Sequence, residues 1–389
     1  KIFHKVRIRI HHGIIIFTLF SYRGSLGNVI FLVRLIYPVI LIVNVCYTLY
    51  GTLKNLSFFR RNFNFYTCLW IPAVPCCSFP SLKCSKANQC NFLTFFDNRE
   101  SHIPSYRSQT LFGTRLSPEI GIEFNDSVYG NHQLIAGVSY IQPFGSTWRN
   151  IRLNPTIYYR YRQHGFNLSF GFIPWRNIRT SLPDYLFSDS LTYFSPNIQG
   201  VHFSYTSRHG FAEFIADWRG MQSIETREAF RLLLTGEYHY QWFFTGGNAQ
   251  LNHLANRLNP PVRDGVCDDI TVQPFIGFNL SQLTPLDTLA LRTSYIFSYQ
   301  RDRKHNQLFI NHGFLAELSI KWRFLEAENT LYIGNPLMPL YPQYGALLNQ
   351  GESFYQHSTY NKTQFSVYIL QCPFATIRFN WNLHYTPNH

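Results

Sequence analysis

The sequence predicts an all-β chain, a transmembrane antiparallel up-and-down β-barrel of the outer-membrane type. Three observations lead to this prediction. Apolar and polar side chains alternate with a period of two, the alternating segments are about ten residues long, and short turns alternate with long polar connections. Strands of that length are suited to crossing a bilayer at a tilt, whereas strands of globular sheets average about five or six residues.

The composition of the 389-residue chain agrees with a wall that has one apolar and one polar face. Aromatic residues make up 17% and charged residues 14%, against about a quarter charged in a typical soluble domain. The mean hydropathy is nevertheless −0.13, so the chain is not uniformly apolar. A large soluble β-sandwich also fits these totals, and composition alone does not separate the two.

Alternation is clearest in three segments, Thr288–Tyr299, Phe314–Arg323 and Ile377–Tyr385. In the first, Leu289, Leu291 and Tyr295 fall on one face, whereas Arg292 and Ser294 fall on the other. The same reading predicts about fourteen strands: 112–124, 132–142, 154–162, 166–174, 198–207, 211–219, 229–243, 246–257, 270–281, 287–300, 308–323, 325–334, 360–371 and 374–386.

Short turns such as Arg162–Gly165 and Arg208–Gly210 alternate with long polar connections at 175–197, 220–228, 258–269, 301–307 and 335–359. Long loops on one rim and short turns on the other are typical of bacterial outer-membrane barrels. With fourteen strands, the last one would end at the long-loop rim. We therefore expect a missing terminal strand and an extra strand within 92–111, giving fourteen to sixteen strands in the complete protein.

The N-terminal quarter differs from the rest. Residues 1–96 hold eleven Lys or Arg and no acid, whereas 97–389 hold 23 basic and 21 acidic residues, and six of the eight cysteines precede residue 91. We expect 1–90 to be a basic, Cys-rich segment outside the fold, either a signal or anchor or misframed sequence. Residues 91–111 form a lead-in or extra strand, and 112–389 form the barrel. The basic excess lies outside the barrel, which argues against nucleic-acid binding.

Two segments, Asn91–Phe124 and Tyr332–Thr363, resemble a group of porin-like outer-membrane barrel proteins of Bacteroidetes-type bacteria. The resemblance covers 91–389. In that group a signal peptide precedes the first segment, and the chain tends to continue past the position of residue 389. The resemblance implies an outer-membrane location and a lipid-bilayer environment, and it brings no catalytic residues with it.

Two sets of side chains are candidates for function. The first set carries charge on the predicted lumen face and comprises Arg160, Arg162, Glu213, Asp217, Arg219, Arg292, Glu317, Lys321 and Arg323. Such groups line a pore and set its ion preference, or they form interior salt bridges that plug the barrel. The second set consists of loop aromatics that stack on a ligand or pack on one another, namely Tyr341, Tyr344, Phe354, Tyr355 and Tyr360.

Catalytic and cofactor motifs are absent from the sequence. It holds no GxSxG, HExxH or Walker pattern, and Asp264, Asp268 and Asp269 lack the spacing of an EF-hand, so we expect them in a solvated loop and expect neither a metal nor a cofactor. We therefore expect a non-enzymatic, porin-like channel for small polar solutes. The alternatives are a surface-exposed binding or structural barrel and, third, a membrane barrel hydrolase.

Overall fold

The computed structural model describes residues 83–102, 106–147, 150–260 and 264–387, together with two short strands at 7–9 and 14–17. The expected signal, anchor or misframed segment, with Cys46, Cys68, Cys76 and Cys77, lies outside these residues except for the two short strands and the start of β3. Cys90, Cys267 and Cys372 are free thiols.

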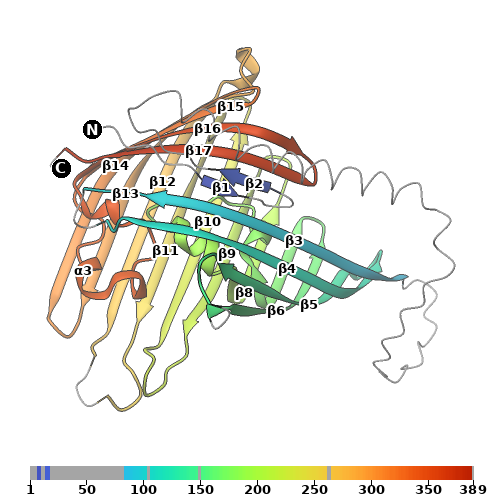
Figure 1. The fold of residues 1–389 in the computed structure, drawn as a ribbon, viewed down its shortest axis with the longest axis horizontal. Coiled ribbons are helices and arrows are strands. Elements are labelled where there is room, and N and C mark those ends of the chain that lie inside the picture. The colour runs from blue at the N-terminus through green and yellow to red at the C-terminus, as the bar shows by residue number, and fades with distance from the viewer. Residues whose placement is uncertain are drawn as a thin grey trace. The chain divides into compact units, whose positions relative to one another are not determined.

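The described chain is almost entirely strand, and each strand from β3 onward pairs antiparallel with the next (Figure 1). The strands are β1 (Arg7–Arg9), β2 (Ile14–Phe17), β3 (Lys83–Arg99), β4 (Gln109–Asp126), β5 (Gly130–Pro143), β6 (Arg152–Gln163), β7 (Phe166–Pro174), β8 (Asn197–Thr206), β9 (Gly210–Gly220), β10 (Ala229–Tyr240), β11 (Phe243–Leu254), β12 (Cys267–Asn279), β13 (Thr288–Asp302), β14 (Gln307–Trp322), β15 (Leu325–Gly334), β16 (Thr359–Cys372) and β17 (Ala375–Tyr385). The α-helices are α2 (Asp189–Phe194) and α3 (Tyr341–Tyr344), and 3-10 turns lie at η3 (Trp175–Asn177), η4 (Ser281–Leu283), η5 (Gly345–Leu347) and η6 (Ser353–Gln356). Within the described residues, no helix is long and apolar enough to cross a membrane.

The predicted all-β, up-and-down architecture is confirmed, and all fourteen predicted strands are present as β4 to β17. The fifteenth strand of the antiparallel series, β3, begins at Lys83, whereas the extra strand was expected within 92–111. The first half of β3 is the polar stretch KCSKANQC, in which apolar residues do not alternate, so its strand character is hidden in the sequence.

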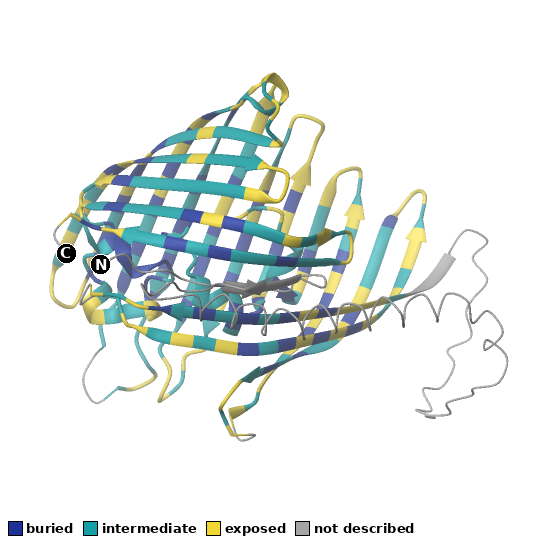
Figure 2. Ribbon diagram, turned by 45° about the horizontal axis from the view of Figure 1, so that its top comes forward, coloured by how far each residue is buried: buried dark blue, intermediate teal, exposed yellow. Residues whose placement is uncertain are grey.

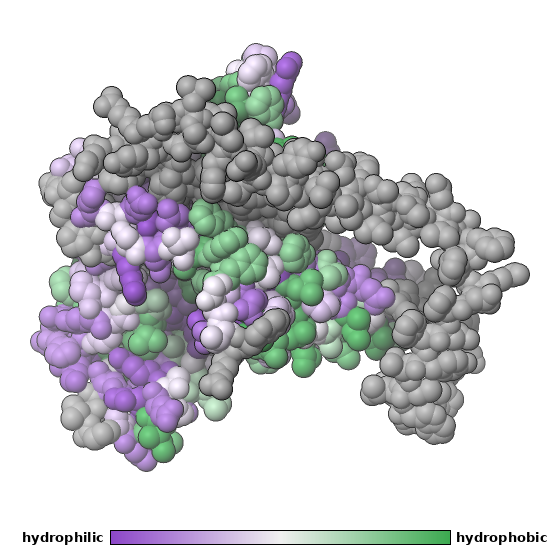
Figure 3. All heavy atoms as spheres, viewed as in Figure 1, coloured by the Kyte–Doolittle hydropathy of each residue, from purple (hydrophilic) through white to green (hydrophobic). Residues whose placement is uncertain are grey.

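Each strand presents one face to the lumen and the other outward, and Figure 2 shows buried and exposed residues alternating along the strands. On β13, Ser294, Ile296 and Ser298 are buried toward the lumen, while Tyr295 and Phe297 are exposed. Hydrophilic residues gather at the end of the long loops and hydrophobic ones over the strands in the view of Figure 3. This distribution is expected for a wall surrounded by lipid.

Tight hairpins close the short-turn rim. Between β6 and β7, His164 and Gly165 have φ angles of +47° and +85°. Two successive positive φ angles are typical of the type I′ turn, whose twist matches that of the paired strands. The predicted alternation of short turns with long connections is therefore present, and the long-loop rim holds the 175–196 and 335–358 connections.

The series β3 to β17 has an odd number of strands, so its first and last strands run in the same direction. They do not pair with each other. Instead β1 pairs antiparallel with both, Ile8 lying opposite Phe379 of β17 and Phe96 of β3. The short strand β2 pairs parallel with β3, Ile14 lying opposite Leu93, so β1 and β2 both lie between the two ends of the series.

Candidate functional site

Two long connections fold into the lumen. The 175–196 connection is held by Glu213, which accepts hydrogen bonds from the backbone N–H groups of Arg179 and Thr180, both at 2.9 Å. The 335–358 connection is held by Gln300, whose Oε1 accepts a hydrogen bond from the Leu340 N–H at 3.0 Å. The two connections also bond to each other, and their apolar side chains build a buried cluster with the inner wall. The long-loop end of the lumen is therefore filled.

Most of the predicted lumen charges do face inward, and four of the nine form ion pairs. Arg292 and Glu317 form a two-bond ion pair at 2.5 and 2.6 Å between β13 and β14. Asp217 pairs with Arg231 at 3.3 Å, and Arg231 lies over the rings of Trp175 and Phe187 of the inserted connection. These contacts are the interior salt bridges that the sequence left as an alternative to a pore wall.

The remaining predicted charges are scattered. Arg160 is buried beside Tyr158, and Arg219 donates to the carbonyls of Ala346 and Leu347 in the 335–358 connection. Lys321 lies over the Tyr368 ring, with Nζ 4.1 Å from its centroid. Arg162 and Arg323 are exposed at the short-turn rim.

The predicted loop aromatics pack inside the molecule. Phe354 and Tyr355 are buried in the lumenal cluster, where Phe354 stacks on Tyr360 with ring centroids 5.0 Å apart. Tyr360 belongs to β16 and not to a loop, and Tyr341 packs against the same cluster. The Tyr344 hydroxyl donates to Asp302 at 2.5 Å. The five rings therefore hold the inserted connection in place in this structure.

Two cavities remain in the lumen beside the inserted connection, with volumes of about 370 Å³ and 330 Å³. Ser181, Leu182, Asp184 and Lys362 line both of them, so this segment of the inserted connection borders both cavities. The first also holds Glu237, Arg292 and Glu317, all of which face the lumen. Solute space therefore remains in the barrel beside the inserted connection.

A different cluster lies on the outward face, at the end of the strands next to the long loops. Trp218, Phe230, His253, Asp268 and Arg301 come from five successive strands and are direct neighbours in register. Trp218 stacks on Phe230 with centroids 5.2 Å apart, and Phe230 stacks on His253 at 4.9 Å. We call this set the rim row. Aromatic side chains at such a level match the aromatic girdle of outer-membrane barrels.

The centre of the rim row is a histidine–aspartate pair. His253 Nδ1 lies 2.7 Å from Asp268 Oδ1, and the Arg303 Nη2 donates to Asp268 Oδ2 at 2.6 Å. The His253 side chain is 22% exposed, and its Nε2 has no partner among the residues that the structure describes. A carboxylate bonded to Nδ1 fixes the ring orientation and leaves Nε2 available to take a proton.

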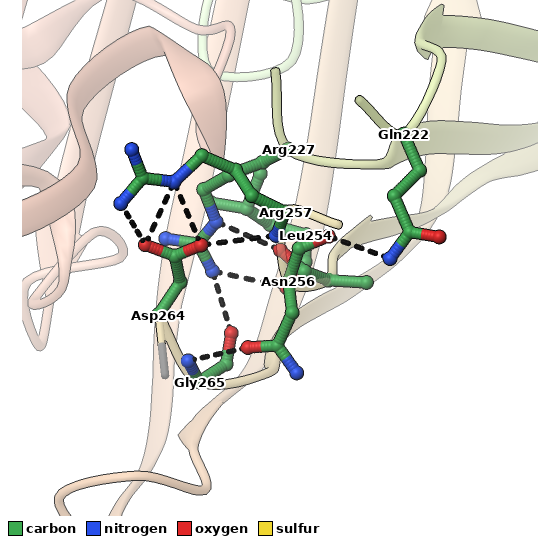
Figure 4. A network of polar contacts seen from close by, with 8 residues as sticks. Gln222, Arg227, Leu254, Asn256, Arg257, Asp264 and Gly265 are labelled. Atoms are coloured by element: carbon green, nitrogen blue, oxygen red, sulfur yellow. Dashed lines mark hydrogen bonds and ion pairs between the residues drawn. The ribbon is translucent and has the colours of Figure 1, made fainter. Parts of the chain in front are cut away.

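The β11–β12 loop next to this pair is itself held by a polar network (Figure 4). Arg257 forms an ion pair with Asp264 at 2.8 Å, and Arg227 donates to the carbonyls of Ala255 and Gly265. Hydrogen bonding from Arg257 lowers the pKa of Asp264 to about 2. The network fixes the connection between the strand that carries His253 and the strand that carries Asp268.

The sequence did not reveal this pair. The expectation that Asp268 and Asp269 lie in a solvated loop is wrong, since both belong to β12. Asp269 is buried in the lumen, where it accepts bonds from Asn252 at 2.8 Å and Gln300 at 2.9 Å. Asp268 points outward, and only the strand register brings it to His253. Among the described residues, no group of three His, Cys, Asp or Glu is placed to hold a metal ion.

The fold and the rim row define an outer-membrane β-barrel. The model of the family described as "Lipid A 3'-O-deacylase-type" matches residues 87–385, and the chain belongs to this family. No curated protein sequence matches the chain.

Solved structures that are similar include OmpT of Vibrio cholerae in its trimer form, with 10% identity, a TM-score of 0.36 and coverage of 78% of this chain and 100% of that one. A triple mutant of the Rhodopseudomonas blastica porin has 7% identity, a TM-score of 0.40 and coverage of 78% and 100%. Salmonella typhi OmpF in complex with daunomycin has 8% identity, a TM-score of 0.37 and coverage of 78% and 97%.

The family corrects one expectation. Its description is that of a deacylase, which is an enzyme activity, so the expectation of a non-enzymatic barrel is wrong. The motifs sought in the sequence are local patterns, whereas the rim row places an acid and a base on two different strands. A local pattern does not detect such an arrangement. The expected bacterial outer-membrane location is confirmed by the family and the barrel.

Proposed function

We propose that the chain hydrolyses an acyl ester of a lipid A-type glycolipid in the outer membrane, with His253 as general base. The observation that carries the proposal is the His253–Asp268 pair, which faces outward at the long-loop rim with Nε2 unpaired among the described residues. Long loops of such barrels face the outside of the cell. The pair therefore lies at the level of the outer-leaflet headgroups, where the ester bonds of a glycolipid are found.

The chemistry requires water and no further reactant. His253 Nε2 takes a proton from a water molecule, and the water oxygen bonds to the acyl carbonyl carbon. When the ester C–O bond breaks, the proton passes to the departing sugar oxygen, which leaves a fatty acid and a free hydroxyl. The guanidinium of Arg303, bonded to Asp268 at 2.6 Å, is placed to stabilise negative charge on the carbonyl oxygen.

The test is acyl release from lipid A by the purified barrel in detergent micelles, followed by mass spectrometry of both products. His253→Gln is expected to lower the rate about 10²- to 10⁴-fold, the usual contribution of a general base. His312→Gln is the matched control, because His312 also faces outward but has Tyr295 Oη at 2.6 Å and no carboxylate. Equal rates for the two variants would contradict the assignment of the base.

A solute channel is the second candidate function, and the two lumenal cavities of about 370 and 330 Å³ favour it. Small polar solutes would pass only if the 175–196 connection moved away from Glu213. Single-channel conductance in planar bilayers tests this candidate. The Bacteroidetes-type origin expected from the sequence stays a prediction, as does a ligand-binding role for the loops.

A further inference from the structure

Three basic side chains continue the rim row beyond Asp268. Arg301 and Arg303 surround the end of β13, and Lys304 follows in the β13–β14 turn, with all three exposed. Arg301 is the register partner of Asp268. A cluster of cations therefore lies directly beside the His253–Asp268 pair, on the outward face of the long-loop rim.

The positive charge of this cluster exceeds the acid that faces it. Asp268 is bonded to Arg303 and to His253. The neighbouring acid, Asp302, is buried on the lumen side, where it accepts hydrogen bonds from Tyr344 and contacts His305. Arg301 and Lys304 form no ion pair with any residue that the structure describes. Two cationic side chains are thus available to an anion from outside the chain.

The backbone that carries the cluster is fixed. The Arg303 N–H donates to the Val266 carbonyl at 2.9 Å, and the Lys304 N–H donates to Asp302 Oδ1 at 2.9 Å. The alkyl chain of Lys304 lies across Gly265, whose φ of +88° and missing Cβ leave room for it. The β13–β14 turn is therefore fastened to the β11–β12 loop, which fixes the backbone that carries Arg303 and Lys304.

Beside and below the cations the wall is strongly apolar, and Leu308 is the register partner of Arg301. Leu308 and Ile310 of β14 are 53% and 70% exposed on the same outward face, and Phe297 of β13 is 54% exposed. A ligand that fits this surface is negatively charged at the level of the rim and apolar along the strands. A phosphorylated glycolipid anchored in the outer leaflet has this distribution.

We infer that Arg301 and Lys304 bind a phosphate group of the glycolipid and bring its acyl ester to His253, while Arg303 stays bonded to Asp268. The inference rests on the proposed function and adds a recognition site to it. Arginine and lysine are the side chains that proteins use to bind phosphate. A phosphate seated here is next to Asp268, so the ester-bearing sugar of the same molecule comes to lie over the middle of the rim row.

The test compares binding of bisphosphorylated lipid A with binding of the same glycolipid after its phosphates are removed, both measured by native mass spectrometry in detergent micelles. The wild-type protein is expected to prefer the phosphorylated form. The double variant Arg301→Gln, Lys304→Gln leaves the bonds of Asp268 in place. It is expected to bind phosphorylated lipid A about 25-fold more weakly, roughly five-fold per lost charge, and the other form unchanged.

The matched control is the double variant Arg162→Gln, Arg208→Gln, which removes two exposed arginines from the short-turn rim and is expected to bind as the wild type does. Equal wild-type affinity for the two glycolipids would overturn the inference, as would equal losses in the two double variants. Phosphate-dependent binding without acyl release would sink the proposed function and leave this site standing. Acyl release without a preference for the phosphorylated glycolipid would contradict this phosphate site and leave the proposed function standing.

Discussion

The inserted 175–196 connection should be released from the lumen when its main anchor is removed by Glu213→Ala. Glu213 accepts three hydrogen bonds from this connection, two from the backbone N–H groups of Arg179 and Thr180 at 2.9 Å and one from the Thr180 hydroxyl at 2.5 Å. A hydrogen bond to a charged group contributes about 1.5–3 kcal/mol. Water in the opened lumen would bond to the released N–H groups and so offset part of this free energy.

At about 1.5 kcal/mol for each of the two backbone hydrogen bonds, the variant loses about 3 kcal/mol of anchoring free energy. Because about 1.4 kcal/mol corresponds to a ten-fold change in an equilibrium constant, the population of the released connection should rise roughly a hundred-fold. The contacts of Tyr185 with Gln273 and of Asp184 with Lys362 remain, so the connection should open transiently and not permanently. Single-channel recording in planar bilayers measures this as open time. We expect a nearly silent wild-type protein and about a hundred-fold longer total open time in the variant.

Glu317→Ala is the matched control, because the Glu317 carboxylate bonds to Arg292 of the wall. It removes a lumenal acid without removing an anchor and should leave the protein silent. Unchanged open time in Glu213→Ala, with heat-modifiable gel mobility showing an intact barrel, would refute the reasoning. An open time in Glu317→Ala as long as that in Glu213→Ala would also refute it, since the loss of a lumenal charge and not the loss of an anchor would then govern conduction.

Three further outcomes are expected. Arg231→Gln should lower the melting temperature in a heat-modifiability assay, because removing the ion-pair partner of the buried Asp217 carboxylate costs about 3–5 kcal/mol. Gly313→Ala should destabilise the barrel by about 1–3 kcal/mol in a urea titration, since a Cβ there would overlap the Tyr332 ring; an unchanged midpoint would refute the close contact. The pKa of Asp264 is lowered to about 2 by its arginine partner, so its stabilisation of the 255–266 loop is complete above the unfolded value of about 3.9 and is lost as pH falls through 2. The protection factors of the amides of that loop, which remove the intrinsic pH dependence of exchange, should accordingly fall between pH 4 and pH 2 and stay flat between pH 5 and pH 7.

The strands could be predicted because the wall enforces a local rule. A residue such as Tyr295 faces lipid and its neighbour Ser294 faces the lumen, so apolar and polar residues alternate in the sequence with a period of two. The rule weakens where neither face requires an apolar side chain, as at the start of β3. That strand was expected later in the chain for this reason. Whether loops fill the lumen could not be predicted, because the composition of a loop does not show whether it folds into the barrel or extends away from it.

The candidate site could not be predicted, because it depends on register. His253 and Asp268 belong to strands whose predicted ends were misplaced by a few residues, and Asp268 was assigned to the loop between them. A shift of one residue moves a side chain to the opposite face. Only the observed pairing shows that Asp268 faces outward beside His253, while Asp269 faces the lumen.

The parity of the wall has a consequence for how the protein assembles. Strands β3 and β17 point the same way, and β1, one of the two short strands between them, pairs Arg7 with Asp97 of β3 and with Asn380 of β17. Every other antiparallel contact of the wall joins neighbours along the chain and can form early, whereas this contact closes the largest loop in the molecule. Closing long loops carries the greatest entropic cost and slows folding. We therefore expect sealing of the wall to be the last and slowest step, after an open ribbon of fifteen strands has formed.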